Sequence, residues 1–314
     1  MRLLLCVFFC LSVPVIPYAE MDKHNGYINS LIFTPDGKNI ISGSWDATIR
    51  LWELSHHLET TVLDGHTLSV NDIVLSPTGE TLASASWDRT IRLWNYKDGT
   101  ELVQLRGHED AVYGIDFSPD GKSLVSASWD YTLKIWDIET RRVAQTLRGH
   151  RANVMAVQYS PSGSTILSAS YDGTIRKWDA VNGNMLSILK GHTNSVNDVS
   201  HIPNSSNAIS ASTDHTVRIW SLDGGKELAK LTSHKSFVTS VVVSSDGKYA
   251  LSGDGKGNAI LWDLSLLDAI YTLKAHEGAI WAVAFSPDKQ NLVTGGADNI
   301  IRQWDFKTGK QILR

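Results

Sequence analysis

Serine, histidine and aspartate recur together along this chain, and nucleophilic triads are built from these residue types. In one stretch the set is His108, Ser126 and Asp130. Catalysis needs one activated nucleophile beside one oxyanion site, whereas the histidine and the hydroxyl residue recur seven times. An element copied this often is typical of a folding constraint. We therefore expect no catalytic residue in the set.

The spacing of the set is regular, with a step of 42 residues. The histidines are His24, His66, His108, His150, His192, His234 and His276. The hydroxyl residues are Ser42, Ser84, Ser126, Ser168, Ser210, Ser252 and Thr294. Tryptophans follow at Trp52, Trp94, Trp136, Trp178, Trp220, Trp262 and Trp304. The aspartates are Asp46, Asp88, Asp130, Asp172, Asp214 and Asp298, and Lys256 fills the sixth position. Seven copies of one structural unit are indicated.

Each copy reads as four short strands, which in the third copy are residues 112–117, 124–128, 132–136 and 143–147. A lone sheet of this size exposes two apolar faces, so the copies must cover one another. About seven strongly twisted sheets close a ring. We predict an all-β, seven-bladed β-propeller over residues 20–314, each blade a four-stranded antiparallel sheet. The last copy has a truncated outer strand at 310–314, so residues 18–22 are a candidate for pairing beside it.

At these residues the sequence resembles the WD-repeat family, and the resemblance spans residues 21–314. The Gly-His openings are Gly65-His66, Gly107-His108, Gly149-His150 and Gly191-His192. The Trp-Asp endings are Trp136-Asp137, Trp178-Asp179, Trp262-Asp263 and Trp304-Asp305. The resemblance implies a hydrogen-bonded network from Trp through Ser/Thr and His to Asp in six copies, with the sixth copy lacking its aspartate. It also implies that peptides and protein partners bind on the rim that carries the histidines and aspartates.

Large aromatic residues stand beside the repeated positions on this rim. Trp and Tyr are the anchors that supply most of the energy in recognition surfaces. We predict a partner-binding rim formed by Tyr27, Trp45, Trp87, Tyr113, Trp129, Tyr171, Phe237 and Trp281. The alternative is that Trp45, Trp87 and Trp129 pack over neighbouring blades and cover the core.

Charge and composition argue against several classes of partner. Lysine and arginine number 29 against 33 acidic residues, so a nucleic-acid partner is not expected. The cations of the third strands recur once per blade, and we expect them to be solvated or ion-paired: Arg50, Arg92, Lys134, Arg176, Arg218 and Arg302. Histidines spread around a ring cannot converge on a metal, and no Gly-rich phosphate loop is present. We expect no metal and no cofactor.

The first nineteen residues read as a signal-peptide-like leader. Arg2 precedes an apolar run over residues 3–13, and the small residue Ala19 follows two prolines. This pattern predicts export, secreted or periplasmic, of a mature chain without stable membrane insertion. The alternative is an N-terminal strand of a cytoplasmic protein.

These observations favour a non-catalytic scaffold that binds a protein or peptide on the aromatic rim. The alternative is an exported propeller enzyme, or a binder of small carbohydrate-like ligands, at the mouth of the central channel. An unrepeated cluster of acids, histidines or metal ligands near the channel would favour the alternative. We find no such cluster in the sequence, and the sequence does not define the partner or the oligomeric state.

Overall fold

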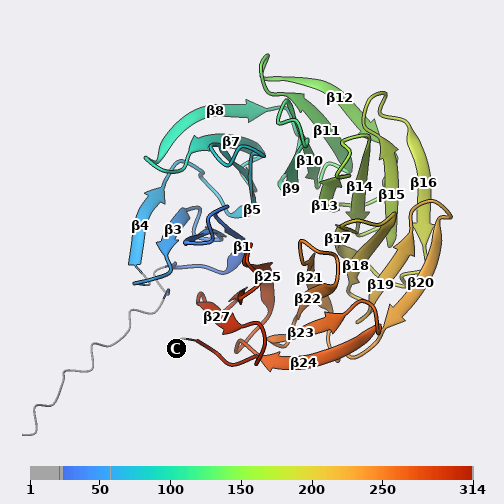
Figure 1. Ribbon diagram of the computed structural model, residues 1–314. Coiled ribbons are helices and arrows are strands. Elements are labelled where there is room, and N and C mark those ends of the chain that lie inside the picture. Colours follow the sequence, from blue (N-terminus) through green and yellow to red (C-terminus); the bar gives the residue numbers. More distant parts are fainter. Residues whose placement is uncertain (1–20, 22–23, 57, 313–314) are drawn as a thin grey trace, which may run out of the picture.

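A computed structural model describes residue 21 and residues 24–56 and 58–312 of the chain. Within these residues there are 27 strands and no helix, grouped into seven antiparallel sheets. The sheets stand around a central axis, and the first blade lies beside the last (Figure 1). The predicted seven-bladed β-propeller is confirmed.

Each sheet is built outward from the channel. The innermost strands are β1 (Ile28–Phe33), β5 (Val70–Leu75), β9 (Val112–Phe117), β13 (Val154–Tyr159), β17 (Val196–Ile202), β21 (Val238–Val243) and β25 (Ile280–Phe285). The second strands are β2 (Asn39–Ser44), β6 (Leu82–Ser86), β10 (Ser123–Ser128), β14 (Thr165–Ser170), β18 (Asn207–Ser212), β22 (Tyr249–Asp254) and β26 (Asn291–Gly296). The third strands are β3 (Ile49–Glu53), β7 (Thr90–Asn95), β11 (Thr132–Asp137), β15 (Thr174–Asp179), β19 (Val217–Ser221), β23 (Asn258–Asp263) and β27 (Ile301–Asp305). The outer strands are β4 (Leu58–Leu63), β8 (Thr100–Arg106), β12 (Arg142–Arg148), β16 (Met185–Lys190), β20 (Lys226–Leu231) and β24 (Asp268–Lys274).

The hydrophobic core lies between adjacent blades. One cluster joins Ala83 and Ile91 of the second blade to Ile115, Phe117 and Trp136 of the third. A corresponding cluster joins the seventh blade to the first, where Ala282 and Ile301 pack with Ile28 and Trp52. Each described sheet covers the next and the last covers the first, so both faces of a blade pack against neighbouring blades.

The seventh blade has three strands, and described residues that precede the first blade and follow the last strand pair at its outer edge. Met21 forms a bridge with Ile301, and Gln311 forms a bridge with Trp304. The Ile301 N–H donates to the Met21 carbonyl at 3.2 Å, and the Ile312 N–H donates to Gln303 at 2.9 Å. These bridges stand where the other blades have a fourth strand.

The predicted leader, residues 1–19, lies outside the described residues, and export stays a prediction. In the part of the chain that is described, no helix has the length and apolar character needed to cross a membrane.

Candidate interaction site on the rim and channel

The repeated polar residues form a chain of hydrogen bonds within each blade. In the third blade the Trp136 indole N–H donates to Ser126 Oγ at 2.8 Å. Ser126 Oγ lies 2.7 Å from His108 Nε2, and His108 Nδ1 lies 2.7 Å from Asp130 Oδ2. Because the Asp130 carboxylate only accepts, His108 Nδ1 carries the proton that is donated to it, and Nε2 accepts the proton of the Ser126 hydroxyl. The histidine is neutral in this arrangement.

The sixth blade also contains this network, so the expectation that it lacks an aspartate is wrong. Asp254 Oδ2 accepts from His234 Nδ1 at 3.0 Å, although Asp254 stands two residues before the repeated position. Lys256, at that position, donates its backbone N–H to Asp254 Oδ1 at 2.9 Å. The signal in the sequence was Ser252-Gly253-Asp254, where the third copy reads Ser126-Ala127-Ser128.

Burial and hydrogen bonding fix the protonation of the network. Burial alone would raise the pKa of Asp130, but hydrogen bonds from His108 and Thr132 hold it well below its usual range. Burial lowers the pKa of His108. Ser126 is fully buried, so its hydroxyl has no access to a substrate. The network therefore ties the strands of a blade to the histidine loop.

Five of the eight predicted rim residues form one continuous aromatic arc. The rings of Tyr27 and Trp45 lie 5.9 Å apart, and those of Trp45 and Trp87 lie 4.6 Å apart. Trp87 lies 5.4 Å from Trp129, whose indole stacks on Tyr113 at 5.9 Å. Such ring pairs hold one another in place. The arc crosses the first three blades as a pre-ordered surface.

The members of the arc differ in exposure. Tyr27 and Trp45 are 44% and 47% exposed. Trp87 and Trp129 are half-buried, and their indole nitrogens are buried without a hydrogen-bond partner in the described structure. The alternative that these tryptophans pack over neighbouring blades thus applies to the buried inner part of Trp87 and Trp129. The rings of Tyr27 and Trp45 are exposed to solvent.

The remaining predicted residues gather at the end of the channel. These three, Tyr171, Phe237 and Trp281, line a cavity of about 270 Å³ together with Tyr113 of the arc, and we call this cavity the mouth. Phe237 lies over Gly255, where any Cβ would overlap its ring. Gly255 stands at the position that carries tryptophan in the first three blades, so Phe237 takes the place of a missing aromatic.

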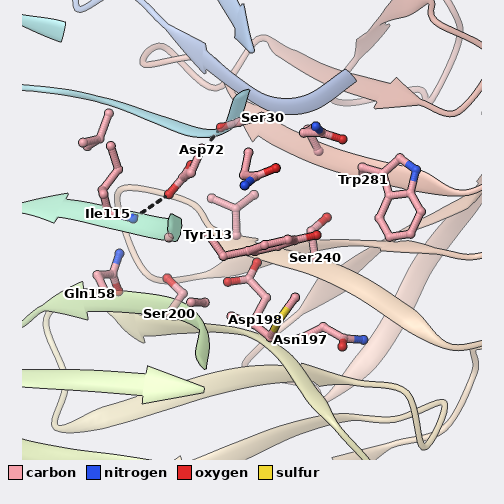
Figure 2. A pocket seen from close by; sticks show the side chains of 18 of the residues that line it. Ser30, Asp72, Tyr113, Ile115, Gln158, Asn197, Asp198, Ser200, Ser240 and Trp281 are labelled. Atoms are coloured by element: carbon pink, nitrogen blue, oxygen red, sulfur yellow. Dashed lines mark hydrogen bonds between the residues drawn. The ribbon is translucent and has the colours of Figure 1, made fainter. Parts of the chain in front are cut away.

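Below the mouth, the innermost strands of all seven blades enclose a cavity of about 300 Å³, which we call the channel (Figure 2). One side chain from each blade borders both cavities, and these are Asn29, Asn71, Tyr113, Met155, Asn197, Thr239 and Trp281. Several of the polar ones also link blades: Asn71 Nδ2, for example, donates to the Val112 carbonyl at 2.8 Å. The mouth and the channel therefore adjoin.

Three aspartates, Asp72, Asp116 and Asp198, line the channel, where we had not singled out any acid from the sequence. Asp72 Oδ2 accepts from the Ile115 N–H at 3.0 Å, as Figure 2 shows. Asp116 and Asp198 likewise accept from the backbone of the next blade, from Tyr159 at 2.8 Å and Val241 at 2.9 Å. These bonds join successive blades.

Burial raises the pKa of Asp72 to about 6, and burial together with repulsion from Asp72 raises the pKa values of Asp116 and Asp198 to about 7. Among the described residues, no Lys, Arg or His lines the channel. The sequence did carry a signal, because Asp72 and Asp198 occupy equivalent positions in innermost strands that are otherwise largely apolar.

The cationic side chains of the third strands lie next to carboxylates or a hydroxyl group. Arg50, Arg92 and Arg218 pair with Glu59, Glu101 and Glu227 of the adjacent outer strands. Arg176 and Arg302 lie 3.5 and 2.6 Å from Asp172 and Asp298, and Lys134 donates to Thr146 Oγ1 at 3.1 Å. The prediction of ion pairing is confirmed for the five arginines. Among the described residues, no three His, Cys, Asp or Glu side chains are grouped to hold a metal ion.

Seven blades, each with a buried Trp, Ser/Thr, His and Asp network, define a repeat propeller of the Trp-Asp class. The chain belongs to the WD40 family (WD domain, G-beta repeat), which it matches in seven segments: residues 16–53, 58–95, 99–137, 141–179, 183–221, 225–263 and 267–305.

Individual relatives match over about one repeat. The small ribosomal subunit protein RACK1 of Caenorhabditis elegans is 36% identical over 44 residues, 14% of each chain. The nuclear distribution protein PAC1 of Candida albicans is 52% identical over 42 residues, 13% of this chain and 9% of the relative. The DDB1- and CUL4-associated factor 13 of Dictyostelium discoideum is 47% identical over 34 residues, 11% and 8% of the two chains. These matches cover a small part of each relative, so they show a shared repeat unit.

Proposed function

We propose that this protein is a non-catalytic scaffold that binds a protein or peptide partner on its aromatic rim. WD40 propellers serve in general as protein-interaction scaffolds. The observation that carries the proposal is the aromatic arc, because it places exposed rings of Tyr27 and Trp45 on an ordered base of Trp87 and Trp129. Rings held in this way bind with little loss of side-chain entropy.

The charges of the molecule support a protein partner over a nucleic acid. The net charge is −4, and the arginines of the third strands are held by carboxylates. A groove that follows a phosphate backbone needs free cations along its length. The rim instead offers aromatic faces and polar side chains.

The mouth favours a second candidate, a small ligand held by aromatic stacking, because four aromatic residues line a cavity of about 270 Å³. Such a ligand would contact Tyr171 and Phe237, which lie outside the aromatic arc. The two candidates therefore depend on different side chains.

Affinity capture with matched variants tests the scaffold. We expect Trp45→Ala with Tyr27→Ala to lose the partners that the unaltered protein retains, whereas Tyr171→Ala alone should lose a small mouth ligand. Leu266→Ala is the control, because Leu266 is 74% exposed and lies in a turn far from the histidine loops. Each captured protein is then purified and titrated while tryptophan fluorescence is measured. Equal retention by Trp45→Ala with Tyr27→Ala and by Leu266→Ala would show that the arc is not the binding surface.

A further inference from the structure

A cavity of about 420 Å³ lies between the third and fourth blades, and we call it the interblade cavity. Its lining residues come from both blades, and they include Ser118, Pro119, Asp120, Tyr159, Gly163 and Ala180. Antiparallel pairing places these residues at the end of the blades opposite to the histidine loops. None of the described residues that line the interblade cavity borders the mouth or the channel, so the three cavities are separate.

The interblade cavity exists because the fourth blade has a small residue where the other blades have a large one. At this position of the repeat, Ala180 stands in the fourth blade, and the other blades carry Leu54, Tyr96, Ile138, Leu222, Leu264 and Phe306. Each of these large side chains packs in the hydrophobic cluster between its own blade and the blade before it. Alanine has too few atoms to fill the same space, so a cavity is left.

The boundary between the first and second blades shows which side chain fits the equivalent space. Tyr96 is buried there, and its hydroxyl donates to the Gly79 carbonyl at 3.2 Å. Gly163 stands two repeats after Gly79, and both glycines are left-handed, with φ of 73° and 68°. Pro119 lies against Gly163 as Pro35 lies against Gly79. The interblade cavity therefore has the backbone frame that holds a tyrosine ring elsewhere in the same molecule.

The polar groups of the interblade cavity favour a neutral hydroxyl group over an anion. Asp120 is the one charged side chain among the described lining residues. Hydrogen bonds from the Ser118 hydroxyl and the Lys122 N–H lower the pKa of Asp120, so it is an ionised acceptor that repels anions. The Gly163 carbonyl accepts no hydrogen bond within the described residues. A phenol hydroxyl thus finds acceptors here, whereas a phosphorylated tyrosine would meet a carboxylate.

The edge of the interblade cavity is open to solvent and apolar. Val181 lines the cavity and is 79% exposed, and its carbonyl accepts from Gln145 Nε2 of the third blade at 2.6 Å. A peptide whose side chain enters the cavity can pack on this valine, a contact outside the cavity that a free phenol would not use. Tyrosine suits such a site, because it combines a large apolar ring with one hydrogen-bonding group.

We propose that the interblade cavity binds a tyrosine side chain of a partner, at the end of the propeller opposite to the aromatic arc. The ring takes the place that Tyr96 takes at the boundary of the first and second blades, and its hydroxyl donates to the Gly163 carbonyl. The site goes beyond the proposed scaffold function and does not depend on it, because the two surfaces share no residue.

The test uses the whole protein and two capped amino acids, N-acetyl-tyrosine amide and N-acetyl-phenylalanine amide, which differ by one hydroxyl group. We expect saturable binding of the tyrosine probe in calorimetry, about fivefold tighter than the phenylalanine probe, as one hydrogen bond predicts. Ala180→Leu and Ala180→Tyr install residues that other blades carry, and each should weaken the tyrosine probe at least tenfold by filling the cavity. Ala144→Leu adds the same leucine on the exposed face of β12, outside the cavity, and is the matched control.

A second measurement needs no ligand. Filling a real cavity with a side chain that fits should raise the urea midpoint of Ala180→Leu or Ala180→Tyr above that of the unaltered protein. Circular dichroism checks that both variants are folded. A lower midpoint in both variants would show that the space between the third and fourth blades is not available, and the proposal would be wrong.

The binding data can overturn the proposal in three further ways. Equal affinities for the two probes would exclude the hydrogen bond of the phenol. Tyrosine binding that persists in folded Ala180→Leu would place the probe at another site, such as the mouth. Binding of p-cresol without binding of the tyrosine probe would make a free phenol, and not a partner side chain, the occupant. If the tyrosine probe fails while partners still bind the arc, this proposal is wrong and the scaffold function stands.

Discussion

At the scale of single residues, the carboxylates divide into two groups with opposite electrostatics. Those of the blade networks accept hydrogen bonds from a neutral histidine and a threonine, which keep Asp130 ionised in spite of burial. Those of the channel accept only uncharged donors, and burial raises the pKa of Asp116 to about 7. The first group stabilises the fold in its ionised form, whereas the second costs stability when it ionises.

Variants of the sixth blade can test whether its network depends on the position of the aspartate in the sequence. Asp254→Ser installs the residue that the third blade has there, and it removes the acceptor for His234 Nδ1. We expect a loss of about 2 kcal/mol in the free energy of unfolding, because a buried donor is left without a partner. The double variant Asp254→Ser with Lys256→Asp restores the usual order and should recover at least half of the loss. Urea denaturation measures both, and no recovery in the double variant would show that Asp254 acts by other contacts.

The channel acids predict an unusual pH dependence. The raised pKa of Asp116 gives a contribution to stability that is present at low pH and lost as pH rises through about 7. The asparagine of Asp116→Asn stays neutral at every pH. The variant should therefore be more stable than the unaltered protein by about 1–2 kcal/mol at pH 8, which corresponds to a pKa shift of one unit or more, and by much less at pH 5. The other titratable side chains among the described residues that line the channel are Asp72, Asp198 and Tyr113, and none of them is basic. Thermal unfolding at the two pH values measures the difference, and a constant difference would argue against a buried charge.

At the scale of elements, the turn between the second and third strands sets the shape of the rim. In every blade one residue of this turn adopts a left-handed conformation: Ala47, Arg89, Tyr131, Gly173, His215, Gly257 and Asn299, with φ from 66° to 79°. Only glycine adopts such angles without strain. Five blades tolerate a side chain there, so the turn is held by its surroundings, including the hydrogen bonds of the aspartate.

The two glycines of this series have different neighbours. At Gly173 the nearest atom to an added Cβ is the Asn194 carbonyl oxygen at 3.5 Å, an ordinary contact. At Gly257 an added Cβ would overlap the His276 carbonyl and come within 2.8 Å of the Gly278 oxygen. The Gly257 carbonyl also accepts the N–H groups of Ala275 and His276.

Gly173→Ala should therefore cost about 1 kcal/mol, the strain of one left-handed alanine. Gly257→Ala should cost clearly more, about 2–4 kcal/mol, because backbone of the seventh blade must move. Chemical denaturation of the pair, one variant controlling for the other, measures the difference. Equal costs would mean that the loop of residues 275–278 moves freely away from the sixth blade.

At the scale of the whole molecule, repetition made the fold predictable. The predicted first strand of the third copy, residues 112–117, coincides with β9, and the seven copies form the seven blades. Positions that depart from the repeat were harder to predict from the sequence. Asp254 was missed because it stands two residues before the position at which the other copies carry the aspartate. Its carboxylate still reaches the histidine of its blade, and the spacing of the repeat does not predict this. The channel acids were missed because Asp72 and Asp198 are 126 positions apart in the chain and meet only when the ring closes.

Closure of the ring can be tested by substituting two isoleucines that occupy equivalent positions. Ile280 packs against Gly253 at the boundary of the sixth and seventh blades, and Ile28 packs against Gly295 at the boundary of the seventh and first. Both side chains are fully buried. In a closed ring, the boundary between the seventh and first blades is packed like the boundary between the sixth and seventh.

Ile28→Ala and Ile280→Ala should consequently each cost about 2–4 kcal/mol, the range for a large side chain lost from a packed core. Both variants should unfold in a single transition, since every blade depends on two neighbours. Urea denaturation followed by tryptophan fluorescence and by circular dichroism measures cost and cooperativity together. If Ile28→Ala cost little while Ile280→Ala cost several kcal/mol, the first and last blades would not be in contact, and the channel enclosed by the seven innermost strands would not exist as a site.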